Sequence, residues 1–574
     1  MTVSEYIFEF LQTWGCQTVY MVSGSSAMWL TDALQRNGRL KAICCHHEQA
    51  AAMAADCWGR TRGIPGVCLT TIGPGATNAI TGVAGAFLDS SPMVVLTGQA
   101  SSRLVQYERD TGIRQHGTQS MNLEPIVSSM VKYFACVMDP ADIRQIMEQA
   151  WHEAVSGRKG PVWIDVPVDI QNKPVPEDMM GYLPPQTAAV TVDMRMVVQK
   201  LLEAEKPLIL AGGGVRSAGC TGLLEQLCRR LHIPVATSRG GIDAVASDSP
   251  YFVGRPGSYG DRASHFAIQQ CDCLLILGSR LAVSTTGYYP QRFGLNAFKI
   301  MVDVDQKELD KPDVPVDLKL SMDLEHFLKM LLSMVPEDAG QTHTSWLEHC
   351  QELRRRYPNV LPEYQVQKPL NSYYVTQLLS QCAPTQCNVV VDTGSVCNVV
   401  SQSWELKRGQ RYLISGGLSA MGFWAGAIGA ASEGRQAVAL AGDGSVQMNV
   451  QEFATLRYNR MPVKLFIFQN NGYLLIRHNQ HNYMNDRFLG VGPDSGLETP
   501  DFCKVAQAYG LDSCELTAGD NLEEAFQDIF RREGPFVCQI RVQEFGEIAP
   551  RIASKVMPDG SLKAAEFDDL YPFL

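Results

Sequence analysis

The sequence predicts an α/β protein built from three doubly wound parallel sheets, and three observations support this prediction. Short, continuous apolar runs recur along the 574 residues, which is typical of parallel strands covered on both faces. Amphipathic segments with helical spacing lie between these runs, as an alternating strand–helix fold requires. Hydrophobic residues make up 45% of the chain and charged residues 19%, the values of an ordinary packed protein.

The apolar runs fall into three groups, each expected to form one sheet. They are 40–44, 67–70, 93–97 and 162–166; then 208–211 and 274–277; then 388–391, 437–441, 463–468 and 536–540. Two proline-containing stretches, 172–190 and 335–370, separate the groups and are predicted linkers. The predicted domains are 1–171, 191–335 and 368–550, followed by a tail over 551–574 that we expect to pack on a surface.

Charge and cysteine content argue against several classes of function. The chain has 60 acidic and 49 basic residues, and the net charge of -11 opposes binding to nucleic-acid phosphates. The 17 cysteines lack zinc-ligand spacing, so we expect reduced thiols in a cytoplasmic protein. The first residues do not resemble a signal peptide, and no apolar run is long enough to span a membrane.

The strongest local motif follows two consecutive strands of the third domain. Asp443 lies in Gly-Asp-Gly-Ser after the run 437–441, and Asn470 lies in Gln-Asn-Asn-Gly after the run 463–468. Side chains at the carboxyl ends of neighbouring parallel strands meet in one crevice. A carboxylate, an amide oxygen and a backbone carbonyl suit Mg²⁺, and glycine N–H groups can approach phosphates. The first motif alone could be a plain turn, but the second motif at this spacing favours a binding site.

A glutamate of the first domain is the second candidate for chemistry. Glu48 lies in Cys45-His46-His47-Glu48-Gln49-Ala50, between the run 40–44 and an alanine-rich helical pattern. A carboxylate in an apolar site has a raised proton affinity and can exchange a proton with a bound base. The alternative is that Glu48 only begins the helix, where an acidic residue is favourable.

These two motifs resemble the signature of thiamine diphosphate (ThDP) enzymes, and the resemblance extends over nearly the whole chain. It implies pyrimidine-binding, central and diphosphate-binding domains in that order. It also implies that Asp443, Asn470 and the carbonyl of Gly472 hold Mg²⁺, and that Glu48 exchanges a proton with the aminopyrimidine. In this family the glutamate and the metal site meet across a subunit interface, so at least a homodimer is expected, and a homotetramer is common.

Other segments share the resemblance. Residues 71–78 (TIGPGATN) resemble the loop beside the pyrimidine, and 415–422 (SGGLSAMG) resemble the segment whose large apolar residue bends the cofactor. That residue, Met421, would by itself be interpreted as a core methionine. Gln119 falls on an active-site glutamine of the family. The implied cofactor-binding residues are Ser25, Pro74, Asn78, Gly394, Ser395, Ser419, Met421, Gly442, Gly444, Ser445 and Asn470.

Within this family the chain is most similar to acetolactate (acetohydroxyacid) synthases, for example over residues 89–99 and over 165–171 (DVPVDIQ). Two charged residues of those enzymes are replaced: a lysine by Val168, and the arginine that would hold a second 2-oxo acid by Ser284. A hydroxyl cannot replace a bidentate guanidinium–carboxylate contact. Segments 22–26 and 394–397 also differ from the corresponding segments of acetolactate synthases. The pattern resembles acetolactate-synthase-like enzymes found with bacterial polysaccharide genes, of the yersiniose type, which implies a nucleotide-linked keto-sugar as acceptor.

The central domain carries glycine turns at positions that contact flavin in acetolactate synthases. The candidate FAD residues are Arg158, Gly212, Gly213 and Gly214. Similar glycine turns occur in loops that bind no ligand. The sequence is therefore compatible with a central domain that binds FAD and with one that does not.

The resulting hypothesis is a ThDP- and Mg²⁺-dependent enzyme that decarboxylates a 2-oxo acid, with pyruvate expected, and joins the two-carbon unit to an acceptor carbonyl. The alternatives are a true acetolactate synthase, a simple 2-oxo acid decarboxylase, an FAD-dependent oxidase, and a non-catalytic binding protein. The last is disfavoured because Glu48 and Asp443 are both present. No nucleic-acid or membrane partner is expected.

Overall fold

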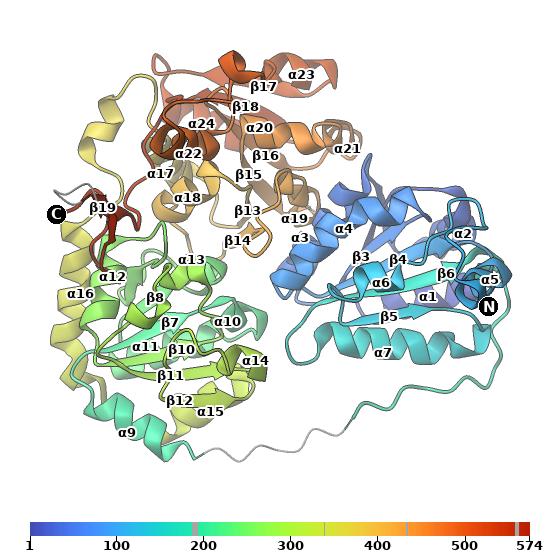
Figure 1. Ribbon diagram of the computed structural model, residues 1–574, viewed down its shortest axis with the longest axis horizontal. Coiled ribbons are helices and arrows are strands. Elements are labelled where there is room, and N and C mark those ends of the chain that lie inside the picture. Colours follow the sequence, from blue (N-terminus) through green and yellow to red (C-terminus); the bar gives the residue numbers. More distant parts are fainter. Residues whose placement is uncertain (186–192, 338, 432–433, 557–561) are drawn as a thin grey trace.

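A computed structural model describes residues 1–185, 193–337, 339–431, 434–556 and 562–574. It contains three six-stranded parallel sheets interleaved with helices, which confirms the predicted fold class (Figure 1). Residues 186–190 of the first predicted linker, 191–192 of the second predicted domain and 557–561 of the predicted tail lie outside the described residues.

The first sheet has the strand order β2-β1-β3-β4-β6-β5. Its central strands are buried along their whole length, as their continuous apolar sequence predicts. The strands are β1 (Thr18–Met21), β2 (Lys41–Cys44), β3 (Gly66–Thr70), β4 (Met93–Gln99), β5 (Tyr133–Cys136) and β6 (Pro161–Pro167). The helices are α1 (Val3–Thr13), α2 (Met28–Asn37), α3 (Glu48–Arg62), α4 (Pro74–Leu88), α5 (Ser102–Thr111), α6 (Glu124–Val127), α7 (Ile143–Val155) and α8 (Val168–Gln171).

The second sheet has the order β12-β11-β10-β7-β8-β9. Its strands are β7 (Pro207–Ala211), β8 (Val235–Thr237), β9 (Phe252–Gly254), β10 (Cys273–Leu277), β11 (Phe298–Asp303) and β12 (Leu318–Ser321). Its helices are α9 (Arg195–Glu203), α10 (Gly213–Ser217), α11 (Thr221–Leu231), α12 (Arg262–Gln270), α13 (Val283–Thr286), α14 (Gln306–Leu309) and α15 (Leu324–Met334), and α16 (Thr344–Arg356) follows them.

The third sheet has the order β14-β13-β15-β16-β18-β17, the same pattern as the first. Its strands are β13 (Cys387–Val391), β14 (Arg411–Ile414), β15 (Gln436–Gly442), β16 (Val463–Gln469), β17 (Asp512–Leu516) and β18 (Phe536–Arg541). Its helices are α17 (Ser372–Cys382), α18 (Ser395–Ser403), α19 (Ala427–Ala430), α20 (Asp443–Val446), α21 (Glu452–Tyr458), α22 (Leu474–Met484), α23 (Phe502–Ala508) and α24 (Leu522–Arg531).

The shared strand order creates a topological switch point in each of these two sheets. The chain leaves β1 toward β2 and then returns to β3 on the other side of β1, and β13, β14 and β15 repeat this path. Ligands of open α/β sheets bind at such points, beyond the carboxyl ends of the strands. The predicted cofactor loops at 22–26 and 71–78 follow β1 and β3, while 392–395 and 442–445 follow β13 and β15.

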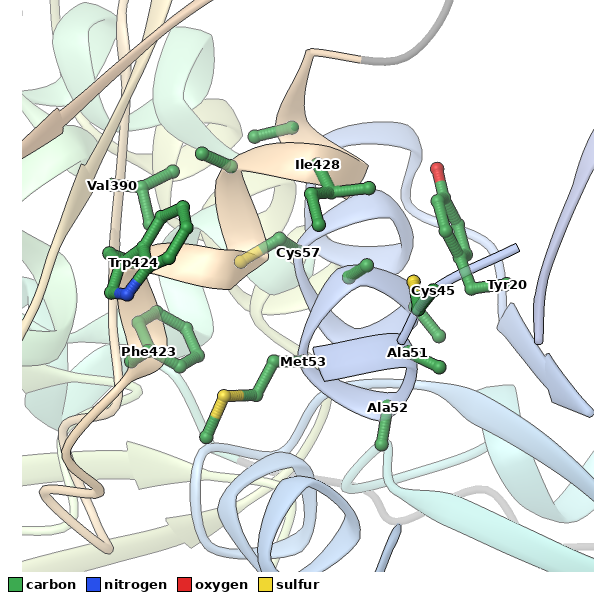
Figure 2. Close-up of a cluster of buried hydrophobic side chains, with 14 of the residues drawn as sticks. Tyr20, Cys45, Ala51, Ala52, Met53, Cys57, Val390, Phe423, Trp424 and Ile428 are labelled. Carbon is green, nitrogen blue, oxygen red and sulfur yellow. The ribbon is translucent and has the colours of Figure 1, made fainter. Parts of the chain in front are cut away.

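The first and third sheets are joined through α3. Figure 2 shows Met53 and Cys57 of α3 facing Phe423, Trp424 and Ile428, and these residues belong to one buried apolar cluster. Two glycines permit this approach. A Cβ at Gly429 would lie 1.8 Å from the carbonyl oxygen of Ala54, and one at Gly426 would lie 2.5 Å from Sγ of Cys57.

The end of the chain returns to the central sheet. β19 (Ser554–Val556) pairs antiparallel with β20 (Leu562–Ala564), and β19 lies near α12 in Figure 1. The ring of Phe567 stacks on buried His265 of α12 with a centroid distance of 4.0 Å. Nη1 of Arg262 donates to the carbonyl of Leu570 at 3.0 Å. All 17 cysteines are free thiols.

Candidate active site

Asp443 lies directly after β15, beside the end of β16, because Gly442 pairs with Phe468 in the register of these two strands. The side chain is fully buried. Its Oδ1 accepts the backbone N–H of Gly444 at 2.8 Å, and its Oδ2 accepts that of Gly472 at 3.0 Å. Burial raises the pKa of Asp443 to about 6, and these N–H donors oppose the rise.

Asn470 supplies the feature that fits a metal ion. Its Oδ1 is buried and has no hydrogen-bond partner among the described residues. Buried polar atoms are normally paired, so this oxygen has room for a ligand that the chain does not provide. An amide oxygen near a carboxylate suits Mg²⁺, which takes oxygen ligands. No group of three His, Cys, Asp or Glu side chains in the described part of the chain could hold a metal, so a mixed set of this kind is the better candidate.

Glycines lie beside Asp443 and Asn470 because neighbouring atoms leave no space there for a side chain. Gly472 has a φ of 132°, and a Cβ there would lie 2.1 Å from the carbonyl oxygen of Val491. A Cβ at Gly444 would lie 2.2 Å from the ring of Tyr473. Gly442 is the residue before α20, so the first N–H groups of this turn follow it directly. The predicted metal residues therefore lie on two adjacent loops.

The end of β13 contributes to the same crevice. Gly394 has a φ of 77°, and α18 starts at Ser395. Ser395 and Asn470 line one pocket, together with Tyr373, Val399, Phe468, Leu474 and Ile548. The free N–H groups at a helix start attract anions, so the placement of Ser395 suits a diphosphate.

The segment that carries Ser419 and Met421 contacts both the predicted diphosphate loop and α3. The N–H of Gly422 donates to Oγ of Ser445 at 3.0 Å, and its carbonyl accepts Nδ2 of Asn449 at 2.9 Å. Met421 is half-buried, and its carbonyl accepts Nε2 of Gln49 at 3.5 Å. Ser419 is exposed with a φ of 55°. The segment is thus fixed on one side by the third domain and contacts the first domain on the other.

Asp392 is a site residue that the sequence reasoning did not assign to a role. It follows β13, is fully buried, and accepts the N–H of Thr393 at 2.7 Å and of Trp424 at 3.2 Å. Ser445 also donates to it, and burial raises its pKa to about 6. Its position immediately after an apolar run is the same signal that identified Asp443.

Glu48 is the first residue of α3, and its side chain is 9% exposed. Its Oε2 accepts Nδ2 of Asn78 at 3.0 Å. Pro74 begins α4, and a Cβ at Gly75 would lie 3.4 Å from Oε1 of Glu48. The predicted glutamate and the predicted pyrimidine loop are therefore in direct contact.

Two more predicted residues flank this loop. Ser25 begins a short 3-10 turn, and a Cβ at the preceding Gly24 would lie 2.4 Å from Cβ of Thr71. Gln119 is exposed with a φ of 61°, and a Cβ at Gly73 would lie 2.8 Å from its carbonyl oxygen. Sequence reasoning did not identify Glu108, which accepts the N–H groups of residues 116 and 117 at 2.6 and 2.8 Å and so holds the loop of Gln119.

The glutamate cluster and the metal cluster share no hydrogen-bonded residue among the described contacts. Glu48 bonds with Asn78, whereas Asp443 bonds with Gly444, Gly472 and Thr499. The predicted site residues therefore fall into two groups, which we call half-sites: one at the first sheet and one at the third.

The candidate flavin residues are engaged within the chain. Nη1 of Arg158 bonds with Asp305 at 2.9 Å and with Glu308 at 2.7 Å. The N–H groups of Gly212 and Gly214 donate to the carbonyls of Leu277 and Gly278. Cβ atoms at Gly212, Gly213 and Gly214 would each approach another backbone segment within 3.0 Å. Close packing explains these glycines without a flavin, and FAD would have to share Arg158 with two carboxylates.

The segment that departs from acetolactate synthases forms α13. The carbonyl of Ser284 accepts the N–H of Ser258 at 3.0 Å, and the N–H of Ile552 donates to the carbonyl of Ser258 at 2.8 Å. The adjacent Tyr259 packs against Val399, Leu474 and Ile548, which line the pocket of Ser395 and Asn470. The altered segment therefore lies one loop away from that pocket.

No helix among the described residues has the length and apolar character needed to cross a membrane.

Three family models of thiamine pyrophosphate enzymes match the chain: the N-terminal TPP binding domain at residues 1–126, the central domain at 194–331, and the C-terminal TPP binding domain at 392–540.

Curated relatives span nearly the whole chain. The large subunit of acetolactate synthase isozyme 2 from Escherichia coli (strain K12) is 30% identical over 561 residues, covering 96% of this chain and 97% of the relative. A probable acetolactate synthase large subunit from Methanocaldococcus jannaschii is 30% identical over 595 residues, covering 99% and 98%. The chloroplastic acetolactate synthase 2 of Zea mays is 29% identical over 581 residues, covering 96% and 87%. With these matches and the two half-sites, the chain belongs to the thiamine pyrophosphate enzymes of the acetolactate synthase type.

Proposed function

We propose that this enzyme uses ThDP and Mg²⁺ to decarboxylate pyruvate and transfers the two-carbon unit to the carbonyl of a nucleotide-linked keto-sugar. The observation that carries the cofactor assignment is the unpartnered, buried Oδ1 of Asn470 close to Asp443. The contact between Glu48 and Asn78 supports the proton-transfer half of the site.

Each candidate residue has a distinct task in this proposal. Asp443, Asn470 and the carbonyl of Gly472 hold Mg²⁺, and the loops of Ser395 and Gly444 bind the diphosphate. When bound at these residues, ThDP would supply the electron sink that decarboxylation of a 2-oxo acid requires. Glu48 would exchange a proton at N1′ of the aminopyrimidine, because its carboxylate contacts Asn78 of the predicted pyrimidine loop. Gln119, exposed beside the pyrimidine loop, orients the substrate.

The acceptor assignment rests on what replaces the two charged residues. Val168 and Ser284 cannot bind the carboxylate of a second 2-oxo acid as lysine and arginine can. The carbonyl of Ser284 accepts the N–H of Ser258, and the next residue, Tyr259, packs on an apolar cluster whose residues line the pocket of Ser395. This favours an acceptor other than a 2-oxo acid, in line with the polysaccharide-gene branch that the sequence resembles.

We also propose that the two half-sites combine between subunits of a homodimer, which can pair into a homotetramer. Glu48 and Asp443 lie on different sheets and share no hydrogen-bonded residue among the described contacts, so a second copy can bring one half to the other. The proposed domains are 1–171, 191–335 and 368–550, because each range encloses one six-stranded sheet. The tail is 551–574.

The test is carbon dioxide release from pyruvate with ThDP and Mg²⁺, with products identified by mass spectrometry. We expect carbon dioxide with little acetolactate, and a new adduct only when a nucleotide-linked 4-keto-sugar is added. The variant Val168→Lys/Ser284→Arg restores the charged pair and should raise acetolactate formation.

A true acetolactate synthase is the second candidate, favoured by the names of the relatives. Efficient acetolactate formation by the unaltered enzyme would assign it that activity. No carbon dioxide release from pyruvate would contradict the proposed donor.

A further inference from the structure

A buried carboxylate from the third domain contacts the turn that carries Glu48. Glu452 is the first residue of α21, nine positions after Asp443, and its side chain is fully buried. Its Oε1 accepts the backbone N–H of His46 at 3.0 Å, and its Oε2 accepts Oγ1 of Thr455 at 2.6 Å. The backbone of His47 also donates to it. The candidate chemistry described above gives this carboxylate no task.

The contact lies on the two residues immediately before α3. The first N–H groups of a helix have no partner inside the helix, and α3 starts at Glu48. The imidazole of His47 accepts the N–H of Gln49 at 3.1 Å, and Glu452 accepts the N–H groups of the two residues just before the helix. A negative charge at this end of a helix is also favourable.

A second contact fixes the turn from the same helix. Nδ1 of His46 lies 3.1 Å from Oγ1 of Thr455, which itself donates to Glu452. The two residues of α21 therefore hold both the backbone and the side chain of His46. They do so from a helix that lies 406 residues away in the chain.

The position of Glu48 depends on this turn, because Glu48 is separated from His46 by one residue. A displacement of about 1 Å in a reacting group can reduce turnover roughly a hundredfold. Catalytic side chains therefore require neighbours that restrict their movement.

We propose that Glu452 is a positioning residue that fixes the Glu48-bearing turn of its own chain from the diphosphate-binding domain. The catalytic part of this inference rests on the proposed role of Glu48. The structural part, the restraint of residues 46–48, stands without it.

The experiment compares Glu452→Ala with Glu452→Gln and with a control, Asp272→Ala. In Glu452→Gln, the side-chain oxygen can still accept the N–H of His46. Its amide nitrogen can donate to Oγ1 of Thr455, and the Thr455 hydroxyl can then donate to Nδ1 of His46. Glu452→Ala removes the bonds made by this side chain. Asp272 also accepts two backbone N–H groups, those of Glu205 and Lys206, but it lies in the central domain before β10.

The first readout is hydrogen–deuterium exchange of the cofactor-free protein. We expect faster exchange at residues 46–48 in Glu452→Ala, and protection close to the unaltered level in Glu452→Gln and Asp272→Ala. The second readout is turnover of pyruvate, with ThDP and Mg²⁺ affinities measured by calorimetry. Glu452→Ala should lose about a hundredfold in kcat. Glu452→Gln should lose about fivefold or less, the equivalent of one hydrogen bond.

Unchanged exchange at residues 46–48 in Glu452→Ala would overturn the inference, as would a loss in Glu452→Gln equal to that in Glu452→Ala. Equal losses of kcat in Glu452→Ala and Asp272→Ala would reduce the effect to general destabilisation and overturn it too. Failure of the proposed function has a different result. Neither the unaltered enzyme nor any variant would release carbon dioxide from pyruvate, but the exchange pattern at residues 46–48 would persist.

Discussion

Glu48 and Asn78 form a hydrogen-bonded pair at 3.0 Å in an almost fully buried position. Glu48→Gln retains the shape and an oxygen that can accept from Asn78, but it cannot ionise. We expect unchanged folding and Mg²⁺ affinity and a fall in turnover of about 10²- to 10⁴-fold, the usual contribution of general acid–base catalysis. Steady-state kinetics and thermal unfolding provide the measurement. Near-full turnover would show that the proton relay is wrong.

The unpaired oxygen of Asn470 leads to an unusual expectation for Asn470→Ala. Because Oδ1 has no partner in the described chain, its removal breaks no hydrogen bond. The free energy of unfolding of the metal-free protein should change by no more than about 1 kcal/mol. Mg²⁺ affinity should fall at least about tenfold, since one oxygen ligand is lost. Calorimetric titration with Mg²⁺ in the presence of ThDP measures this, and unchanged affinity would remove Asn470 from the metal site.

At the scale of residues, the sequence was informative where chemistry follows a strand directly. Asp443 and Asn470 were predicted from two strand ends, and the register of β15 and β16 places those ends side by side. The partner of His46 could not be predicted this way. Glu452 lies in an ordinary helical pattern, and only the packing of α21 against the start of α3 shows its contact.

The contact of α3 with α19 depends on glycine. In Gly429→Ala the new Cβ would lie 1.8 Å from the carbonyl oxygen of Ala54, so the two elements would have to separate. We expect a loss of about 1–3 kcal/mol in the free energy of unfolding. Gly222→Ala in α11 is the control, because a Cβ there meets no atom within 4 Å. It should stabilise by about 0.5–1 kcal/mol. Chemical denaturation followed by circular dichroism compares the two, and equal effects would refute the packing argument.

The tail carries a pH dependence through His265. Burial lowers the pKa of this imidazole to about 4 from 6.5, and Phe567 stacks on the ring. Between these values the unfolded state binds more protons than the folded state. The contribution of neutral His265 to the free energy of unfolding is therefore complete above pH 6.5. It is lost as the pH falls through 4, at up to about 1.4 kcal/mol per pH unit.

Hydrogen exchange of residues 565–574, corrected for the intrinsic effect of pH, measures this. We expect the corrected protection to fall between pH 7 and pH 5. His265→Gln should be less protected at pH 7 and should vary little with pH. An unaltered enzyme whose tail is equally protected at both values would contradict the assignment to His265.

At the scale of elements, continuous apolar runs predicted the buried strands well. The run 463–468 became β16 (Val463–Gln469), and the run 93–97 became β4 (Met93–Gln99). The short edge strands β9 (Phe252–Gly254) and β14 (Arg411–Ile414) were not predicted, and neither were the interior strands β1, β8 and β11. Three or four residues carry too little periodicity to separate a strand from a loop, and pairing with a neighbour decides the outcome.

The division of the site between two sheets gives a prediction for the whole molecule. If Glu48 of one copy serves Asp443 of another, a dimer of Glu48→Gln and Asp443→Asn chains retains one intact site. Each variant alone should be nearly inactive. Co-expressed with different tags and purified as a hybrid, the pair should recover up to about half of the activity of the unaltered dimer. A hybrid as inactive as its parents would place both groups of each site in one chain.

The whole fold was predictable because three separate groups of strands and two linkers are visible in the sequence. The arrangement of those units was not. The contact of α3 with Phe423, Trp424 and Ile428 joins segments more than 350 positions apart, and local patterns hold no information on such distances. The resemblance to ThDP enzymes supplied that information instead.

The burial of Phe567 has a consequence for synthesis on the ribosome. Phe567 is 4% exposed in the apolar cluster that also contains Ala263, Ile268 and Leu274 of the central domain. It is translated roughly 230 residues after the last helix of the central sheet, which takes on the order of 10–50 s at typical elongation rates. Throughout that interval the nascent chain exposes an apolar surface around α12. An uncovered apolar surface of this kind favours association with other chains until the tail closes over it.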